Sequence, residues 1–196
     1  PRLADSDGGS ILVGTDARGW TDIRALDVGS LRRQVHVVPQ ESFLFSDSLA
    51  ANLRFARPEA TDEALHHALA LAAGDEILGH LPDGFETKLG DRGVTLSGGQ
   101  RQRLCLARAL LSGAAILALD DATSALDAAT ERRVLENIRG LRDQGAPVTL
   151  LVVSSKLSTI LMADRVLLLA GGRIAASGTH AELAKNSPAY RDLMGI

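Results

Sequence analysis

Two apolar runs in the second half of the chain predict neighbouring strands of a parallel sheet. Ala114–Asp120 (AAILALD) is continuously apolar and ends in an acid, and Val148–Ser154 (VTLLVVS) is similar. Runs of this kind are typical of strands that are covered on both faces, as in parallel sheets. Residues 129–144 (ATERRVLENIRGLRDQ), between the two runs, have helical spacing. Strand, helix and strand in this order predict a βαβ unit and an α/β fold.

The first half of the chain predicts short strands followed by a block of helices. Ile11–Thr15 (ILVGT) and Arg33–Pro39 (RQVHVVP) have strand character, and the proline that ends the second cannot donate to a strand ladder. From Ser46 the spacing becomes helical in SDSLAANLRFA and in TDEALHHALALAAG, where Thr61 is the expected N-cap. A loop (HLPDGFETKLGDRGV) follows, and Ser97–Leu111 predicts one more helix. This block looks like an insertion into the α/β core.

The end of the chain predicts a hairpin and two helices. RVLLLAGG and RIAASG flank Gly171–Gly172 as hairpin strands, and THAELAKN and SPAYRDLMGI have helical character. We therefore expect three parts: residues 1–45 as the first portion of the core, 46–112 as the helical subdomain, and 113–196 as the remainder of the core.

Composition and charge exclude some function classes. The 196 residues are 45% hydrophobic and 23% charged, which is ordinary for a globular domain. The formal net charge of −3 gives no general attraction to nucleic acid or to an anionic membrane surface. Cys105 is the single cysteine, so no internal disulfide can form, and a reducing compartment is favoured. No apolar run approaches the roughly 18 residues of a membrane span, so we expect any membrane role to depend on a partner or on another part of a longer polypeptide.

The start of the Ser97–Leu111 helix has an unusual composition. Ser97 and Gln100 have the spacing of a capping box. Gly98 and Gly99 each cost about 1 kcal/mol relative to alanine in a helix. They either mark a flexible helix start or let an anion approach backbone N–H groups at the positive end of the helix. The residues alone leave these two interpretations open.

Acids follow the first apolar run. Asp120 and Asp121 end the strand ILALDD, and Asp127 follows in ATSALD. The carboxyl edge of a parallel sheet is where ligands bind in α/β folds. Adjacent carboxylates repel each other unless a cation or a proton lies between them. The alternative is a solvated turn or a helix cap.

The whole pattern resembles the ATP-binding cassette family. LSGGQRQR followed by ILALDDATSALD resembles its signature, Walker B and D-loop motifs, and VVPQESFLFSDSLAANL resembles its Q-loop. TKLGDRGVTLSGGQ is similar to the X-loop and signature of the exporter branch, VSSKLSTI lies where the family has its switch loop, and RVLLLAGGRIAASGTHAEL matches the closing segment. The resemblance covers nearly the whole chain. It implies a RecA-like P-loop NTPase core with a mainly parallel sheet and an inserted helical subdomain, and ATP and Mg²⁺ as cofactors.

The resemblance also implies roles for individual residues. Asp120 is expected to orient Mg²⁺ together with Gln40, which is also expected to take part in catalysis. Asp121 occupies the place of the catalytic glutamate, and Ser155 that of the switch histidine. The signature residues would bind the ATP of a partner subunit, and the D-loop residues would contact that subunit. The signature residues are Ser97, Gly98, Gly99 and Gln100, and the D-loop residues are Ser124 and Asp127.

The chain departs from the family pattern at its phosphate-binding loop. It contains no G-x-x-x-x-G-K-[ST] string, because none of the three lysines, Lys88, Lys156 and Lys185, follows a glycine. We expect the chain to begin just after that loop, so that the N-terminal β-layer and the Walker A segment are missing. Because backbone amides and a lysine carry most phosphate contacts in such sites, we expect the chain alone to bind ATP weakly or not at all.

Two further departures affect the expected catalytic residues. The side chain of Asp121 is one methylene shorter than glutamate, which places its carboxylate about 1 Å short of the attacking water and can lower the rate by about 10²-fold. Ser155 can hydrogen-bond a phosphate but has no positive charge and no imidazole. An intact signature beside an altered catalytic pair resembles one half of a heterodimeric exporter.

The expected function is therefore that of an ATP-hydrolysing motor domain of an exporter, at the cytoplasmic face of the membrane. Its partners would be a second, non-identical nucleotide-binding domain and the coupling helices of transmembrane domains outside this chain. SFLFSDSLAANL would meet those helices, although Phe43, Leu44 and Phe45 fit a subdomain core equally well. A non-catalytic dimerisation or regulatory module is the alternative. A role on DNA or ribosomes is disfavoured by the near-neutral charge.

Overall fold

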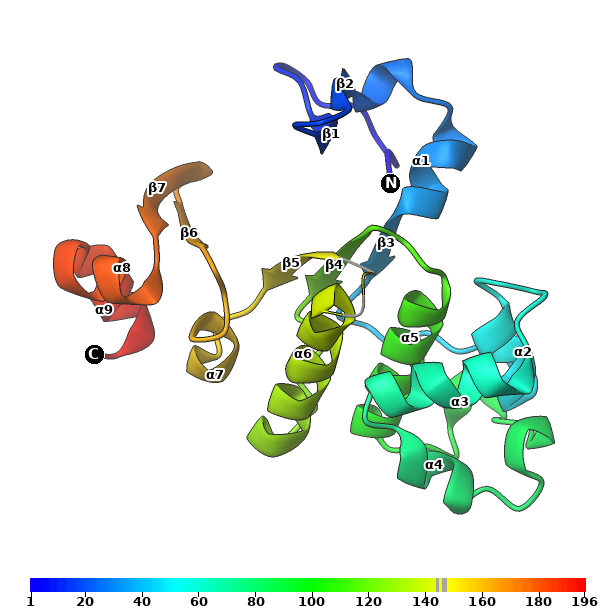
Figure 1. Ribbon diagram of the computed structural model, residues 1–196. Coiled ribbons are helices and arrows are strands. Elements are labelled where there is room, and N and C mark those ends of the chain that lie inside the picture. The colour runs from blue at the N-terminus through cyan, green and yellow to red at the C-terminus, as the bar shows by residue number, and fades with distance from the viewer. Residues whose placement is uncertain (144, 146–147) are drawn as a thin grey trace.

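A three-stranded parallel sheet forms the centre of the molecule. The computed structural model describes residues 1–143, 145 and 148–196. Strands β3 (Val35–Val38), β4 (Ile116–Asp120) and β5 (Thr149–Val153) lie in the order β3–β4–β5 and all run parallel (Figure 1). The parallel α/β core predicted from the two apolar runs is confirmed.

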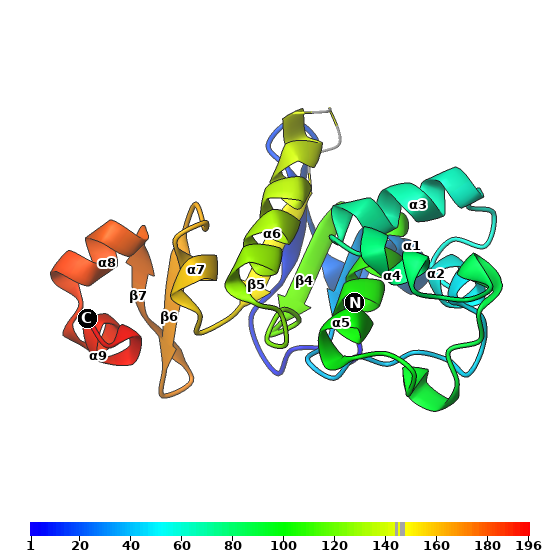
Figure 2. The ribbon, with the colours of Figure 1, turned by 90° about the horizontal axis from the view of Figure 1, so that it is seen from below.

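Two helices cover one face of this sheet. Helix α5 (Gly98–Leu111) precedes β4, and helix α6 (Ala128–Asp143) connects β4 to β5, as the crossover prediction requires. Leu117 and Leu119 of β4 belong to the same buried cluster as residues from both helices. In Figure 2, the ribbons of α5 and α6 lie on the viewer's side of the sheet. Residue 144, where the crossover helix was predicted to end, lies outside the described residues. None of the helices in the described ranges is long and apolar enough to cross a bilayer.

The opposite face of the sheet is open in the described structure. Leu151 and Val153 are each 58% exposed and Val37 is 37% exposed. Along β5, exposed and half-buried residues alternate. The prediction that the strands are buried on both faces is therefore wrong for β5. Parallel pairing was inferred correctly from the apolar run, but the helices that cover the sheet pack on one side only.

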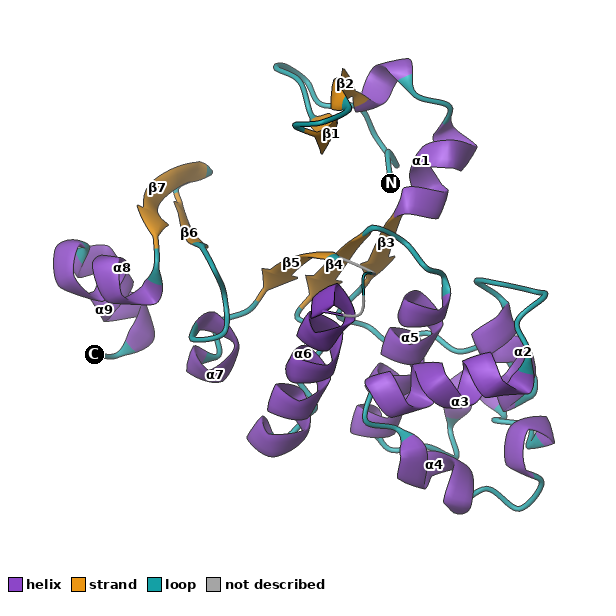
Figure 3. Cartoon of the chain, viewed as in Figure 1, coloured by secondary structure: helices purple, strands orange, loops and turns teal. Residues whose placement is uncertain are grey.

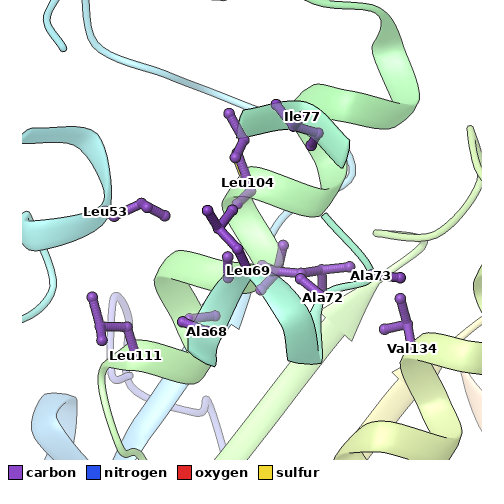
Figure 4. Packing of buried hydrophobic residues seen from close by; sticks show 14 of the residues in the cluster. Leu53, Ala68, Leu69, Ala72, Ala73, Ile77, Leu104, Leu111 and Val134 are labelled. Atoms are coloured by element: carbon purple, nitrogen blue, oxygen red, sulfur yellow. The ribbon is translucent and has the colours of Figure 1, made fainter. Parts of the chain in front are cut away.

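The helical block has its own tightly packed interior. It contains α2 (Leu49–Arg54), α3 (Asp62–Leu71), the short α4 (Asp75–Gly79) and α5, and the predicted loop after α4 holds 3₁₀ turns at Gly84–Glu86 and Asp91–Gly93. Figure 4 shows the helices pointing apolar side chains into one cluster, with Leu69 of α3 and Leu104 of α5 near its centre. Thr61 caps α3 as predicted, because its hydroxyl accepts from the Ala64 N–H at 3.3 Å. The domain boundaries at residues 45 and 112 stay predictions.

The N-terminal part is a small hairpin that leads into the sheet. Strands β1 (Leu12–Thr15) and β2 (Gly19–Asp22) pair antiparallel, and a 3₁₀ turn (Ile23–Ala25) follows. Helix α1 (Val28–Gln34) then runs directly into β3. The predicted strand at residues 33–39 therefore begins too early, because the carboxylate of Asp27 accepts from the Ser30 N–H at 2.8 Å and starts a helix that extends through Gln34.

The C-terminal part follows its prediction. After the single-turn helix α7 (Leu157–Ile160), strands β6 (Val166–Ala170) and β7 (Arg173–Gly178) form an antiparallel hairpin, followed by α8 (His180–Asn186) and α9 (Pro188–Met194). A separate small core holds this part together; it consists of Ile160, Leu168, Leu183 and Tyr190. Figure 3 shows the three sheets of the described structure apart from one another, with the helical block and the C-terminal part on opposite sides of the central sheet.

Candidate functional site

Some of the expected site residues lie at the carboxyl edge of the central sheet. Asp120 is the last residue of β4, where it pairs with Val153 of β5, and its side chain is exposed. Gln40 follows the end of β3, and Ser155 follows the end of β5. Because parallel strands end at the same edge, these residues share that edge although they are far apart in the sequence.

Asp121 is held in an unusual backbone conformation at this edge. Its φ angle is +47°, a left-handed conformation that non-glycine residues rarely adopt and that Asp and Asn tolerate best. The Asp121 N–H donates to the Val153 carbonyl at 3.0 Å, and its carboxylate oxygen Oδ2 accepts from Gln40 Nε2 at 3.3 Å. These two bonds tie the turn after β4 to both neighbouring strands and orient the carboxylate toward Gln40.

The glycine-rich helix start lies nearby on α5. Ser97 Oγ accepts from the Gln100 N–H at 3.2 Å, and Gln100 Oε1 accepts from the Ser97 N–H at 2.8 Å, which confirms the predicted capping box. Ser97 and Gly98 are exposed. A second molecule can therefore reach this end of the helix.

Gly99 lies against the turn that follows the paired acids. A Cβ atom added at Gly99 would lie 3.0 Å from the Ala125 carbonyl oxygen. Gln102, buried one turn further along α5, donates from Nε2 to Ser124 Oγ at 3.0 Å and accepts at Oε1 from the Ala125 N–H at 2.9 Å. The helix start and the 124–127 turn thus form one unit. The sequence did not single out Gln102, because a polar residue in a helix ordinarily predicts an exposed position.

Asp127 has a local structural role. Its Oδ1 accepts from the N–H groups of Ala129 and Thr130 at 3.0 and 2.9 Å, and its Oδ2 accepts from Thr130 Oγ1 at 2.7 Å. The backbone and side-chain hydrogen bonds from Thr130 lower the pKa of Asp127. The helix-cap alternative considered for the acids therefore describes Asp127, and its contact with a second subunit stays a prediction.

The side chains of Asp120 and Gln40 at the sheet edge are suitable ligands for a Mg²⁺ ion that is also bound by phosphate oxygens. Mg²⁺ is usually bound by one or two carboxylates together with substrate phosphates, and it prefers oxygen ligands. Asp120 supplies an exposed carboxylate and Gln40 an amide oxygen. The described residues include no group of three or more His, Cys, Asp or Glu side chains that could hold a metal by themselves, and His66 and His67 are exposed on α3. The donor set thus fits Mg²⁺ shared with phosphates.

Comparison with known proteins gives relatives of one kind. A family model described as "ABC transporter" matches residues 2–124. The "ABC transporter ATM1" of Toxoplasma gondii is 44% identical over 173 residues, which are 88% of this chain and 15% of the relative. A "Putative multidrug export ATP-binding/permease protein" of Staphylococcus aureus is 40% identical over 196 residues, which are 100% of this chain and 32% of the relative.

A solved structure has the same fold. The chain matches a bacterial Atm1-family ABC exporter with ATP bound, with a TM-score of 0.82 and 35% identity, over 89% of this chain and 30% of that one. The chain thus spans a third or less of the length of these relatives. Their sequences and this structure confirm the α/β class of the P-loop NTPase type and the exporter resemblance. Since the family model covers well over half of the residues, the chain belongs to the ABC transporter family.

Proposed function

We propose that this chain forms part of an ATP-hydrolysing motor domain that drives export across a membrane. The observation that carries the proposal is the hydrogen bond between Gln40 and Asp121, beside the strand-end carboxylate of Asp120. It brings the expected catalytic and metal-binding groups to one sheet edge, where ligands of α/β folds bind.

Each group at the edge has a distinct part in the proposed reaction. Asp120 and Gln40 would hold Mg²⁺, which would offset the negative charge of the nucleotide's phosphates. Asp121 orients the attacking water and accepts its proton, with the Gln40 amide fixing the carboxylate. Ser155 donates a hydrogen bond to the terminal phosphate in the place where the family has histidine. Because Asp121 is short and Ser155 is uncharged, turnover at this site is slow.

The exposed start of α5 serves a second nucleotide-binding domain. Ser97 offers its hydroxyl, and Gly98 and Gly99 leave the first backbone N–H groups of the helix open to the phosphates of a nucleotide held by the partner. Gln100 maintains the capping box that keeps this helix start in place. With an intact signature and an altered catalytic pair, the chain is one half of a heterodimer whose other half holds the faster site. Ser124 lies on the side that faces this partner.

A cluster of exposed aromatic residues is proposed to meet the coupling helices of the transmembrane domains. Phe43 and Phe45 are exposed with ring centroids 5.1 Å apart, and Phe55, also exposed, lies 4.6 Å from Phe45. Leu44, between the first two, is buried in the helical core. The core interpretation therefore describes Leu44, and the contact of the exposed aromatic residues with coupling helices is the proposal. A motor domain attached in this way works at the cytoplasmic face of the membrane.

The test compares two substitutions in the intact transporter that we propose contains this chain. Ser97→Arg fills the signature and is expected to abolish most ATP hydrolysis, whereas Asp121→Asn is expected to remove only a minor part. Ser10→Arg, on the exposed N-terminal segment, and Asp164→Asn, on the exposed turn before β6, are the matched controls. If Asp121→Asn abolishes turnover while Ser97→Arg changes little, the heterodimer assignment is wrong.

The alternative is a dimerisation or regulatory module without catalysis. It is favoured by Asp121 and Ser155, which stand where the family has glutamate and histidine. In that case neither Ser97→Arg nor Asp121→Asn alters ATP hydrolysis by the complex, but Ser97→Arg weakens its assembly. Sedimentation analysis beside the ATPase assay separates the two functions.

A further inference from the structure

A buried carboxylate lies behind the site described above. Glu131, in the first turn of α6, is 0% exposed. Its Oε1 accepts from Thr123 Oγ1 at 2.5 Å and from Thr159 Oγ1 at 3.0 Å, and its Oε2 accepts from Ser158 Oγ at 2.8 Å. Glutamate is rarely buried to this degree unless it is paired, so the surroundings of Glu131 require an explanation.

Lys156 supplies the compensating charge. Its Nζ lies 3.6 Å from Glu131 Oε1 and donates to the carbonyls of Thr123 at 2.7 Å and Leu126 at 3.1 Å. The ammonium thus donates two hydrogen bonds and forms one ion pair, and all three partners belong to the 123–131 segment. Burial favours the neutral acid, but the three hydroxyl donors and the charge of Lys156 outweigh it and lower the pKa of Glu131.

The network joins two segments that flank the sheet edge. Thr123 and Leu126 belong to the turn that begins at Asp121 and ends at the cap of α6. Lys156 directly follows Ser155 and precedes α7, and Ser158 and Thr159 lie within α7. Glu131 lies between these segments and bonds to both of them. A shift of either segment would break hydrogen bonds to a buried charge, which is costly because the charge then loses its compensation.

We propose that Glu131 and Lys156 are positioning residues that lock the 121–127 turn to the segment carrying Ser155, so that both sides of the sheet-edge site move as one unit. Neither side chain touches the nucleotide in this account. Lys156 fixes the backbone on which Ser155 sits, and through the Thr123 and Leu126 carbonyls it fixes the turn that presents Asp121 and Ser124. The inference rests on the proposed function, because the site it positions is the one assigned there.

A matched ion pair on the same helix provides the control. Arg139 of α6 reaches Asp164, which follows α7, at 3.1 Å, but both side chains are largely exposed. This pair also ties α6 to the segment after β5, yet it touches neither the 121–127 turn nor Ser155. If the Glu131–Lys156 network only anchored α6, loss of either pair would have the same kind of effect.

The first measurement is hydrogen–deuterium exchange of the 196-residue chain without nucleotide. Lys156→Met is expected to speed exchange at least about tenfold both at residues 123–127 and at 155–160, since both segments lose the same anchor. Glu131→Gln keeps the shape and is expected to give a smaller change at the same two segments, which covers the case in which Lys156→Met fails to fold. Asp164→Asn is expected to leave residues 123–127 unchanged. Faster exchange confined to 155–160 overturns the inference.

The second measurement is ATP hydrolysis by the intact transporter with this chain's own signature disabled by Ser97→Arg, which removes turnover at the partner's site, so that turnover at this chain's own site is measured. Lys156→Met is expected to lower kcat about tenfold or more with KM for ATP little changed, because misplacement of about 1 Å affects the chemical step. Lys156→Arg, which keeps the charge, is expected to recover part of the loss. An unchanged kcat overturns the inference. If the unaltered transporter hydrolyses no ATP at all, the proposed function fails instead, and the exchange result alone decides the inference.

Discussion

The side-chain amide of Gln40 donates a hydrogen bond to Asp121 Oδ2 at 3.3 Å, although 81 positions separate the two residues in the sequence. Gln40 follows β3 and Asp121 follows β4, so the bond spans two adjacent strand ends of the parallel sheet. It fixes the direction of a carboxylate whose backbone is already held in the left-handed conformation at φ +47°. We therefore expect the reach of this carboxylate, and not its orientation, to limit the proposed reaction.

Lengthening this side chain is expected to speed hydrolysis at the site. Asp121→Glu adds one methylene and moves the carboxylate about 1 Å outward, which is expected to raise the turnover by up to about 10²-fold if reach is limiting. The measurement is ATP hydrolysis by the intact transporter with this chain's own signature disabled by Ser97→Arg, so that only the site containing Asp121 turns over. Asp75→Glu, an equal extension on the exposed surface of α4, is the control. An unchanged or lower rate in Asp121→Glu would show that reach does not limit the reaction.

The two glycines of the signature are expected to differ in their tolerance of alanine. At Gly98 the nearest atom to an added Cβ is 3.7 Å away, which is ordinary contact, so Gly98→Ala is expected to be neutral or to stabilise the chain by up to about 1 kcal/mol. At Gly99 the added Cβ meets the Ala125 carbonyl at 3.0 Å, and backbone cannot easily move aside. Gly99→Ala is therefore expected to be less stable than Gly98→Ala by about 1–3 kcal/mol.

Urea denaturation of both glycine variants checks this difference. The two substitutions add the same methyl group to the same helical turn, so each serves as the control for the other. Equal free energies of unfolding would mean that the 124–127 turn moves away from the added Cβ without a loss of stability. That result would contradict the attachment of this turn to α5 through Gln102.

The parts of the fold that follow from local pattern were predictable from the sequence. The capping box of Ser97 and Gln100, the cap at Thr61 and the C-terminal hairpin each depend on neighbouring residues, and all three are present. The parallel sheet followed from the apolar run that ends at Asp120. Helix α1 was not predicted, because VGSLRRQ has too few apolar positions for a helical period and its start depends on a cap by Asp27.

The parts of the site that depend on distant contacts were not predictable from the residues alone. Glu131 lies in a charged stretch, ATERR, that by composition belongs on a solvated helix face. It is buried because Thr123, Lys156, Ser158 and Thr159 converge on it from two other segments. In the same way, the sequence could not indicate that Leu151 and Val153 of β5 are exposed. A continuous apolar run predicts a strand, but it does not show which face of the sheet the helices will cover.

The centre of the helical block is expected to control the stability of the chain. Leu104 is 1% exposed and belongs to the same buried cluster as Leu69 and Ile77 (Figure 4). Leu104→Ala removes buried methyl groups and leaves a cavity, which is expected to lower the free energy of unfolding by about 2–5 kcal/mol. Leu193→Ala, at a largely exposed position on α9, is expected to change it by less than about 0.5 kcal/mol. Similar losses in the two variants, measured by urea denaturation, would contradict the packing described here.

The buried carboxylate of Glu131 is expected to make stability depend on acid pH. Its pKa is lowered in the folded chain, so the folded state binds fewer protons than the unfolded state near the ordinary glutamate value of about 4.3. The stabilisation is fully present above that pH and is lost as the pH falls through the folded pKa, because the acid must then be protonated while buried. Lys156 is the charged group that faces Glu131, at 3.6 Å from Oε1. Urea denaturation between about pH 6 and pH 3 is therefore expected to show a steeper loss of stability in the unaltered chain than in Glu131→Gln, by at most about 1.4 kcal/mol per pH unit for one proton.

The control variant is Glu136→Gln, which removes an exposed carboxylate from the same helix. It is expected to lose stability with the same slope as the unaltered chain. Asp127 also has a lowered pKa but is present in all three proteins, so its contribution cancels in the comparison. Parallel profiles for Glu131→Gln and the unaltered chain would mean that the buried network does not hold Glu131 in its charged form.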